Sequence, residues 1–386
     1  GSSAGGSGEQ TAAADSRQNE AGSSTEAAPK TETAATASHS WNNMSPVSSM
    51  DLLYADQFSV DYYENDISLI TIGDTDQFLL LPEGMSAPVG LPDSIKILQK
   101  PVKNIYLVAT SAMDDFIHLD AMDLIALSGT KDTGWYLPEA RTAMEEGKIA
   151  YAGKYSAPDY ETIVSSSCEL AVESTMIYHT PEVKEQLERL GIPVLVERSS
   201  YESHPLGRME WIRLYGLLTG KEEEADQIFQ ENMNALSDVL AMKPSGKTAA
   251  FFYVTNSGSV NVRKNGDYIA KMIDIAGGTY VPENAGTGEN ALSTMNMDFE
   301  SFYAAAKDAD VLIYNSTIDG ELTTIDELCA KNQLFADFKA VKEGNVWCTG
   351  KNMFQETMGL GDMIRDMNAV FADDTEYSFT YLHQLK

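Results

Sequence analysis

The sequence predicts an α/β protein of two lobes, each built on a parallel sheet, joined by one long α-helix. Strand-like and helix-like segments alternate on both sides of a central region, and this order is typical of parallel sheets covered by helices. The central region, residues 204–242, has the pattern of two helices broken at Gly220. The chain has 386 residues, which is long enough for two hydrophobic cores.

The central region is expected to connect the lobes rigidly. Its first helix, up to Gly220, carries too many apolar residues for a surface helix, so we expect it to be buried on most sides. The second begins with three glutamates at 222–224, which suit the positive end of a helix dipole, and its apolar residues follow helical spacing until Pro244. With a rise of about 1.5 Å per residue, this interlobe helix over residues 221–244 would span roughly 30 Å.

Residues 1–48 consist mainly of small and polar amino acids, and Trp41 is the first aromatic residue. Such a segment buries too little apolar surface to offset the entropy of ordering it, so we expect a disordered tether. The sequence begins without a methionine or a signal peptide, and we therefore expect it to start after a processing site.

The first lobe is predicted over residues 49–220. Residues 51–90 alternate in the manner of strands, with turns at Asn65 and at Gly73-Asp74, and predict a β-hairpin or small meander. The α/β order then begins with a continuous apolar run. The predicted strands are 104–109, 124–128, 149–153, 170–174 and 192–196, and the predicted helical segments are 112–119, 160–164 and 182–190.

The second lobe is predicted over residues 245–386. A glycine pair at 277–278 is expected to end its first helix. The predicted strands are 248–254, 311–314 and 345–348, and the predicted helices are 267–276, 299–306, one from residue 324 and 360–371.

The composition argues against several classes of function. A net charge of −31 disfavours nucleic acid and anionic membrane surfaces as partners. No run of about 20 apolar residues predicts a membrane span. Cys168, Cys329 and Cys348 lack metal-ligand spacing and are expected to be small buried hydrophobes, and the five histidines do not cluster. We therefore expect no cofactor, no metal site and no catalytic residue.

Seven short sequence segments, in their order and spacing, resemble those of one protein family. They are residues 102–111, 159–164, 187–194, 216–225, 297–301, 307–314 and 338–347. The resemblance is to the substrate-binding proteins of ABC importers for iron-siderophores, haem and cobalamin, and it covers about residues 103–371. It implies two Rossmann-like lobes, a single long interlobe helix and a ligand cleft between the lobes. Residues 165–170 depart from the family's usual Leu-Lys-Pro-Asp, which leaves that turn open.

The resemblance implies an extracytoplasmic, monomeric lipoprotein that captures an iron-siderophore-type chelate and delivers it to the membrane permease. The small-residue tether is similar to the spacer behind a lipidated cysteine at the extracellular face of the cell membrane, although this sequence does not include that cysteine. Cobalamin or another corrinoid, and haem, remain alternative ligands, and a surface sensor or adhesin on the same fold is an alternative of another class. An enzyme is disfavoured, because the sequence has no Gly-x-Ser-x-Gly elbow, phosphate loop or strand-linked GxGxxG.

Glu161 and Glu300 lie in the same local frame, an aromatic residue followed by the acid at the start of a helix, in opposite lobes. The resemblance implies that such a pair docks onto arginines of the permease, one acid per lobe. Two fixed negative charges would place the protein on a basic partner and speed their encounter. The alternative is that each acid only interacts favourably with its helix dipole.

The ligand is expected at loops that follow strands, where α/β proteins place their sites. Arg208 and Arg263 suit carboxylate, catecholate or hydroxamate oxygens, and a structural ion pair, for example of Arg208 with Glu202 or Glu210, is the alternative. Aromatic residues would stack on the ligand or else form the core, and His204 or Tyr201 could ligate a haem iron. The predicted ligand-binding residues are Ser111, Met113, Trp135, Tyr136, Tyr155, Tyr201, His204, Arg208, Trp211, Asn256, Arg263, Tyr268, Asn315, Met353, Phe354 and Gln355.

Overall fold

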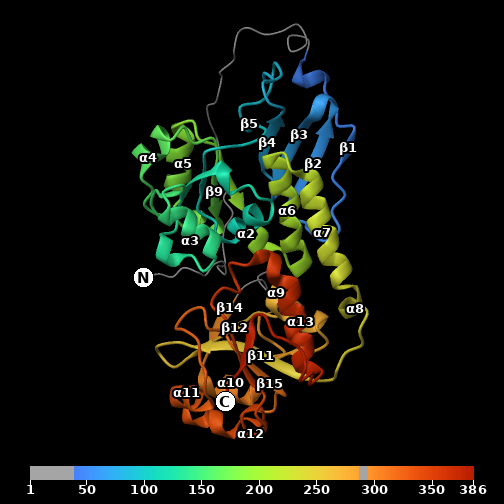
Figure 1. The fold of residues 1–386 in the computed structure, drawn as a ribbon, viewed down its shortest axis with the longest axis vertical. Helices are drawn as coiled ribbons and strands as arrows, with labels where there is room; N and C mark the ends of the chain where they lie inside the picture. The colour runs from blue at the N-terminus through green and yellow to red at the C-terminus, as the bar shows by residue number, and fades with distance from the viewer. Residues whose placement is uncertain (1–38, 287–293) are drawn as a thin grey trace. The chain divides into compact units, whose positions relative to one another are not determined.

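The computed structural model describes residues 39–286 and 294–386, which form two compact units (Figure 1). Of these residues, the N-unit contains 39–202 and 210–229, and the C-unit contains 203–209, 230–286 and 294–386. Most of the predicted tether, residues 1–38, lies outside the described residues. Ordered structure begins before residue 49, since Trp41 lies in a short 3-10 helix and its ring centroid is 5.4 Å from that of Tyr63.

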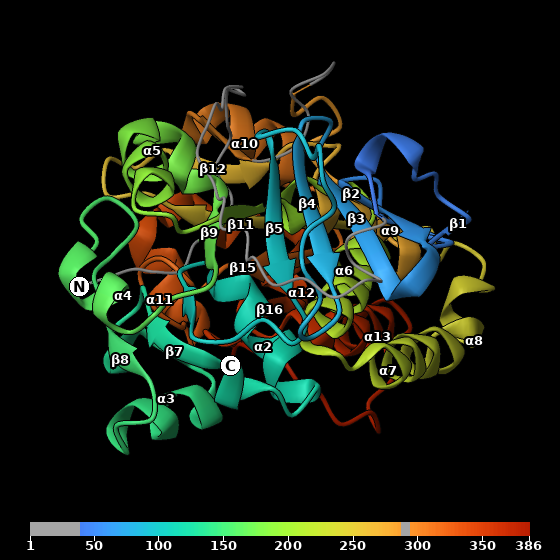
Figure 2. The same ribbon diagram turned by 90° about the horizontal axis from the view of Figure 1, so that it is seen from above.

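The N-unit contains two sheets. The first has the order β1-β2-β3-β4-β5; β1 to β4 are antiparallel, β5 is parallel to β4, and β2 to β5 lie side by side in Figure 2. The second has the order β10-β9-β6-β7-β8 and is parallel throughout, as predicted. The strands are β1 (Ser48–Ser49), β2 (Phe58–Tyr63), β3 (Ile67–Ile72), β4 (Asp76–Leu81), β5 (Ile95–Gln99), β6 (Ile105–Leu107), β7 (Ile125–Ser128), β8 (Ala150–Tyr151), β9 (Ala171–Ser174) and β10 (Val194–Glu197).

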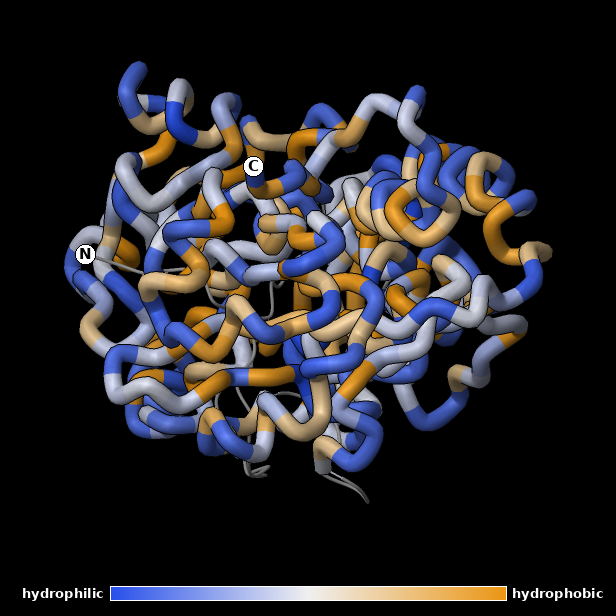
Figure 3. Tube along the Cα trace, turned by 90° about the horizontal axis from the view of Figure 1, so that it is seen from below, coloured by the Kyte–Doolittle hydropathy of each residue, from blue (hydrophilic) through white to orange (hydrophobic). Residues whose placement is uncertain are grey.

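Helices follow or connect the strands of the parallel sheet. Figure 3 shows helical segments at the periphery that alternate between hydrophilic and hydrophobic residues, as amphipathic helices do. The helices up to the C-unit sheet are α2 (Thr110–His118), α3 (Pro138–Glu145), α4 (Tyr160–Ser165), α5 (Pro181–Arg189), α6 (Pro205–Thr219), α7 (Glu222–Ala235) and α8 (Ser237–Leu240). Among the described residues, no helix is long and apolar enough to cross a membrane.

The break at Gly220 is confirmed. Gly220 has φ 76°, and the amide N–H of Lys221 donates to the carbonyl of Gly216 over 2.7 Å, while that of Gly220 donates to Leu217. This is a Schellman motif, which ends a helix at a glycine in the left-handed conformation.

The predicted continuous helix over residues 221–244 is wrong in length. α7 has 14 residues and ends at Ala235, so it spans about 21 Å. Leu236 is buried against Gly361 of α13 (Leu360–Phe371), where an added Cβ would lie 3.2 Å from Leu236 Cδ1. The apolar pattern continues past this point because Leu236 and Val239 are both buried, although the helix has already been interrupted.

The C-unit is built on one mixed sheet of order β14-β12-β11-β15-β16-β17, with β13 beside β11. β11, β13, β15 and β16 are parallel, and antiparallel β12 and β17 flank this parallel part. The elements are β11 (Thr248–Val254), β12 (Val260–Arg263), α9 (Tyr268–Ile275), β13 (Thr279–Tyr280), β14 (Thr294–Met297), α10 (Phe299–Ala306), β15 (Val311–Tyr314), α11 (Ile325–Lys331), α12 (Lys339–Glu343), β16 (Val346–Thr349), α13 (Leu360–Phe371) and β17 (Leu382–Gln384).

Candidate functional site

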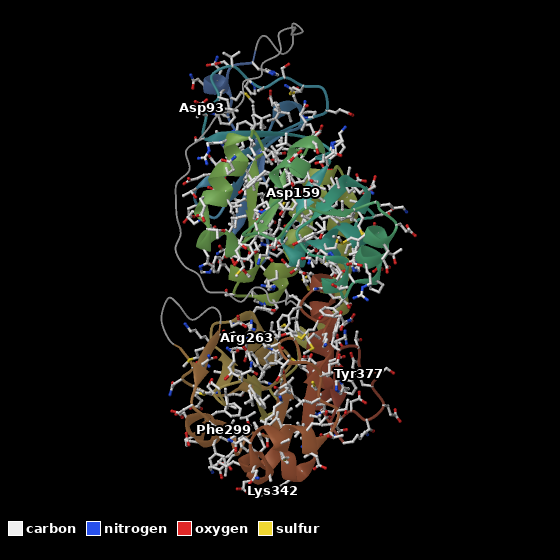
Figure 4. The ribbon with its side chains drawn as sticks, turned by 90° about the vertical axis from the view of Figure 1, so that its left-hand side faces the viewer. Asp93, Asp159, Arg263, Phe299, Lys342 and Tyr377 are labelled. Carbon is white, nitrogen blue, oxygen red and sulfur yellow. The ribbon has the colours of Figure 1, made fainter. Side chains whose placement is uncertain are left out.

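Two predicted arginines of the C-unit converge on one predicted tyrosine. Arg208 lies near the start of α6, Arg263 ends β12, and Tyr268 begins α9. The guanidinium carbon of Arg208 is 3.9 Å from the ring centroid of Tyr268, and that of Arg263 is 5.5 Å from it. All three residues are buried, with 6%, 2% and 5% of their surface exposed. Figure 4 shows Arg263 and Lys342 of α12 at opposite ends of the C-unit.

Arg263 forms a buried bidentate ion pair with Asp267. Its Nε lies 2.8 Å from Oδ2 and its Nη2 lies 3.1 Å from Oδ1. Asp267 Oδ2 also accepts the amide N–H of Ile269, so the same carboxylate caps α9. Arg263 therefore forms a structural ion pair, which was the alternative to ligand binding for the predicted arginines. The planar guanidinium edge that was expected to hold a ligand binds Asp267.

Phe354 extends the cluster from the loop after β16. Its ring centroid lies 5.7 Å from the guanidinium carbon of Arg263. Its neighbours Met353 and Gln355 are each 2% exposed. Cation–π contacts that exclude water contribute about 2 kcal/mol or more, so this arrangement fixes both guanidinium planes. The structure thus brings Arg208, Arg263, Tyr268 and Phe354 together.

His204 caps the start of α6. Its Nδ1 accepts the amide N–H of Leu206 over 3.1 Å. Burial, and then the positive charge of Lys271, lower the pKa of His204, so the ring is neutral at pH 7. Tyr201, the other residue considered for haem ligation, lies in the N-unit.

Two predicted asparagines follow β11 and β15. Asn315 is buried, and its side-chain oxygen accepts from the amide and the hydroxyl of Thr317 over 3.1 Å and 2.7 Å. Asn256 is exposed in the turn between β11 and β12. Among the described residues, neither asparagine forms a hydrogen bond with Arg208 or Arg263.

In the N-unit, three of the seven predicted ligand residues are buried in the interior. Met113 and Trp211 are 0% exposed, and Trp135 is 1% exposed. The indole N–H of Trp135 donates to the Ser128 hydroxyl, and that of Trp211 donates to Glu202. These three residues therefore pack in the core, which was the alternative to ligand binding. Ser111 lies in α2, Tyr155 packs beside the core, and Tyr136 is 40% exposed.

The expected partners of Arg208 in the structural alternative, Glu202 and Glu210, bind other groups. Glu210 accepts the amide N–H groups of Leu53, Tyr54 and Ala55 over 2.8–2.9 Å. Glu202 accepts those of residues 56 and 57, besides the Trp211 indole. Both carboxylates belong to the N-unit and fasten a segment that precedes β2. An acid that serves distant backbone groups leaves no local pattern, so sequence reasoning did not find this role.

The two proposed docking acids have matching surroundings. Glu161 is the second residue of α4 and Glu300 the second residue of α10, and both are exposed. Asp159 caps α4 by accepting the amide of Thr162 over 3.2 Å, and Asp298 caps α10 by accepting that of Ser301 over 2.7 Å. Figure 4 labels Asp159 in the N-unit and Phe299 in the C-unit. Each acid therefore sits on a capped helix start of its own unit.

Sequence reasoning also missed Arg198, which directly follows β10 and lies among Tyr178, Tyr201 and Gln57. Its position after a strand met the criterion applied to the other candidates. Among the described residues, no cluster of three or more His, Cys, Asp or Glu side chains could hold a metal ion.

Comparisons with known proteins identify a family to which the sequence is similar. The sequence matches the periplasmic binding protein family over residues 108–353. A lipoprotein of Methanocaldococcus jannaschii is 25% identical over 328 residues, which are 79% of this chain and 77% of that protein.

Two solved structures share the fold. A periplasmic haem-binding protein of Pseudomonas aeruginosa has a TM-score of 0.57 and 15% identity, covering 74% of this chain and 98% of its own. A petrobactin-binding protein of Bacillus subtilis has a TM-score of 0.54 and 13% identity, covering 73% and 94%. At this level of identity the likeness shows the fold alone.

Proposed function

Because the chain belongs to the periplasmic binding protein family, we propose that it captures an iron-siderophore-type chelate outside the cytoplasm and delivers it to an ABC permease. The coarser part, a substrate-binding protein of the ABC-transporter type, follows from the family. The observation that carries the finer part is the convergence of Arg208 and Arg263 on Tyr268.

The chemistry of this cluster suits an anionic, partly flat ligand. A guanidinium donates hydrogen bonds in a planar fork, which matches paired oxygens of carboxylates and catecholates. Asp267 holds Arg263 in a buried ion pair. We assign Arg208 to the ligand because its guanidinium carbon lies 3.9 Å from the Tyr268 ring centroid, which places a cation and an aromatic face together. Aromatic rings beside the arginines add stacking area. The net charge of −31 does not oppose such a ligand, because the local field near the cluster decides binding.

Haem and corrinoids remain the alternative ligands of this role. One structural neighbour is a haem-binding protein by its description, and a haem carries carboxylates that an arginine could bind. A surface sensor or adhesin on the same fold is the alternative from another class. The position of the ligand between the two lobes, the monomeric state and the absence of enzymatic activity stay predictions.

We further propose that the chain is anchored by a lipidated cysteine that this sequence does not include. Support comes from the relative described as a lipoprotein. Glu161 and Glu300 are proposed to bind the permease, and their exposure on similarly capped helices of separate units supports this role.

A titration tests the ligand class. Tryptophan fluorescence of the purified chain is measured against a panel of ferric siderophores, cyanocobalamin and haemin. We expect saturable quenching by at least one ferric siderophore with a Kd in the micromolar range or below. Saturation by cyanocobalamin or haemin alone would transfer the assignment to that ligand, and no saturation by any of them would remove the carrier function.

A further inference from the structure

Arg198 is held in a fixed orientation in the N-unit. Its Nε donates to Gln57 Oε1 over 3.0 Å, and its Nη1 donates to the Tyr178 hydroxyl over 2.8 Å. Its guanidinium carbon lies 4.5 Å from the ring centroid of Tyr201 and 6.0 Å from that of Tyr178. Two hydrogen bonds and a stacked ring leave this long side chain little rotational freedom, so the entropy of positioning it is already lost.

Within the described ranges, no carboxylate forms an ion pair with Arg198. The acids nearest in sequence serve other groups: Glu197 accepts from the Ser199 amide and the Tyr215 hydroxyl, and Glu202 accepts from two amides and an indole. A partly exposed arginine without an acid is unexpected in a chain of net charge −31.

The contacts leave one edge of the guanidinium for a ligand. Gly73, in the turn between β3 and β4, lies against the Nε side, where an added Cβ would be 3.4 Å from Nε. Nη1 uses one of its hydrogens for Tyr178, and Nη2 donates no hydrogen bond within residues 39–286 and 294–386. The edge formed by Nη1 and Nη2 can therefore present two N–H groups side by side, the geometry that binds a carboxylate through both oxygens.

The position of Arg198 fits a ligand contact. It directly follows β10, at the carboxyl end of the parallel sheet β10-β9-β6-β7-β8. Ligands of open α/β sheets bind at this end of the strands. Tyr178 and Tyr201 come from the short helices that follow β9 and β10, so the whole group belongs to that edge.

We propose that Arg198 is the anion-binding residue of the N-unit and that it binds a carboxylate group of the captured ligand. This inference rests on the proposed function and narrows it to chelates that carry a free or peripheral carboxylate. A purely structural role, in which Arg198 only fastens Gln57 to the sheet, predicts a change in stability without selectivity among ligands.

The test compares Arg198→Gln with a matched control, Arg189→Gln in α5. Arg189 is also an arginine that donates to a glutamine, Gln186, but it is exposed on a helix. Fluorescence titrations use ferric citrate and haemin, which carry carboxylates, and a neutral ferric trihydroxamate. We expect Arg198→Gln to raise the Kd of the carboxylate-bearing probe that the wild type binds at least tenfold. The Kd of the neutral chelate should change less than twofold. Arg189→Gln should change neither Kd.

A second measurement is independent of iron chelates. The melting temperature is recorded in citrate and in sodium chloride of equal ionic strength. Citrate should raise the melting temperature of the wild type and of Arg189→Gln, but not of Arg198→Gln. Arg198→Lys, which keeps the charge without the fork, should retain only part of the citrate effect and serves if the glutamine variant does not fold.

The outcomes separate the two proposals. Chelate binding that is unchanged in Arg198→Gln, or reduced equally for charged and neutral probes, overturns the role of Arg198 and leaves the carrier function standing. Citrate stabilisation through Arg198 without binding of any chelate supports the anion site and removes the iron-carrier function. If neither citrate nor any chelate acts on the wild type, both proposals fail.

Discussion

At the scale of single residues, Arg208 and Arg263 are the same residue type but have different contacts. Both guanidinium groups lie near the ring of Tyr268, but Arg263 also forms an ion pair with Asp267, four positions later in the chain. A buried ion pair of this kind fixes geometry, and removing either partner leaves an uncompensated charge in the interior. Arg208 is therefore the better residue for testing ligand contact without collapse of the α9 cap.

We expect Arg208→Gln to weaken binding of the preferred ferric siderophore by roughly 10- to 100-fold, since a hydrogen bond to a charged group contributes about 1.5–3 kcal/mol. The control is Arg365→Gln, which removes a surface pair with Asp238 in the same unit and should leave the Kd unchanged. Fluorescence titration measures both. Equal affinities of Arg208→Gln and the wild type would exclude Arg208 from the ligand contacts.

Glu173 in β9 is a carboxyl group in an apolar core. It is 0% exposed, and neither side-chain oxygen has a hydrogen-bond partner among the described residues. Burial raises the pKa of Glu173 from 4.5 to about 8. Between these two pH values the folded state keeps a proton that the unfolded state releases. The contribution to stability is thus complete below pH 4.5 and is lost as the pH rises through 8.

We expect the stability difference between Glu173→Gln and the wild type to shift in favour of the variant by about 1.4 kcal/mol per pH unit over this window. Urea unfolding at pH 5, 6, 7 and 8 measures it, with Glu185→Gln on the exposed face of α5 as the control. Parallel stability curves for Glu173→Gln and the wild type would show that Glu173 does not titrate in this way.

At the scale of elements, two buried carboxylates accept backbone hydrogen bonds that a neighbouring strand would accept in a sheet. Residues 53–57 lie outside any sheet, and their amide groups donate to Glu210 and Glu202. Asp366 in α13 holds the C-terminal segment similarly, by accepting the amides of residues 380–382 and the Tyr377 hydroxyl. Each acid satisfies backbone donors that would otherwise be buried without a partner.

Glu210→Ala should lower the free energy of unfolding by about 3–5 kcal/mol, because it leaves three amides without their acceptor and removes one of the two acid partners of Arg213. Hydrogen exchange should also increase at residues 53–55 before global unfolding. Glu224→Ala, an exposed acid of α7, is the control. Unchanged exchange at residues 53–55 would show that Glu210 does not hold this segment.

At the scale of the whole molecule, the net charge of −31 makes encounter with a basic partner fast and dependent on salt. The repeated frame Asp-aromatic-Glu-hydroxyl at residues 159–162 and 298–301 gives each unit one exposed acid on a capped helix. Under the docking role proposed for Glu161 and Glu300, these two fixed charges would place both units on a basic permease.

We expect the double variant Glu161→Ala with Glu300→Ala to keep the wild-type Kd for its ligand and to lose uptake of radiolabelled iron chelate in cells. The control, Glu185→Ala with Asp308→Ala, changes the net charge equally at exposed acids of both units and should transport normally. Normal uptake by the Glu161 and Glu300 variant would remove the docking role.

The sequence by itself determined what depends on neighbours a few positions apart. Gly220 ended α6, Glu161 and Glu300 lay at helix starts, and apolar runs marked the parallel strands, because helix-end signals and burial periodicity are local. The tertiary structure decided the rest. Short β12, β14 and β17 were not predicted, because their pairing depends on strands elsewhere in the chain.

The same reason applies to the site. Residue types and strand ends predicted Arg208, Arg263, Tyr268 and Phe354, but only folding showed that they meet, with Asp267 occupying Arg263. Glu210 meets Ala55 across 155 positions, and Arg198 meets Gln57 across 141. Contacts over such separations are set by how sheets and helices pack, so no local pattern in the chain encodes them.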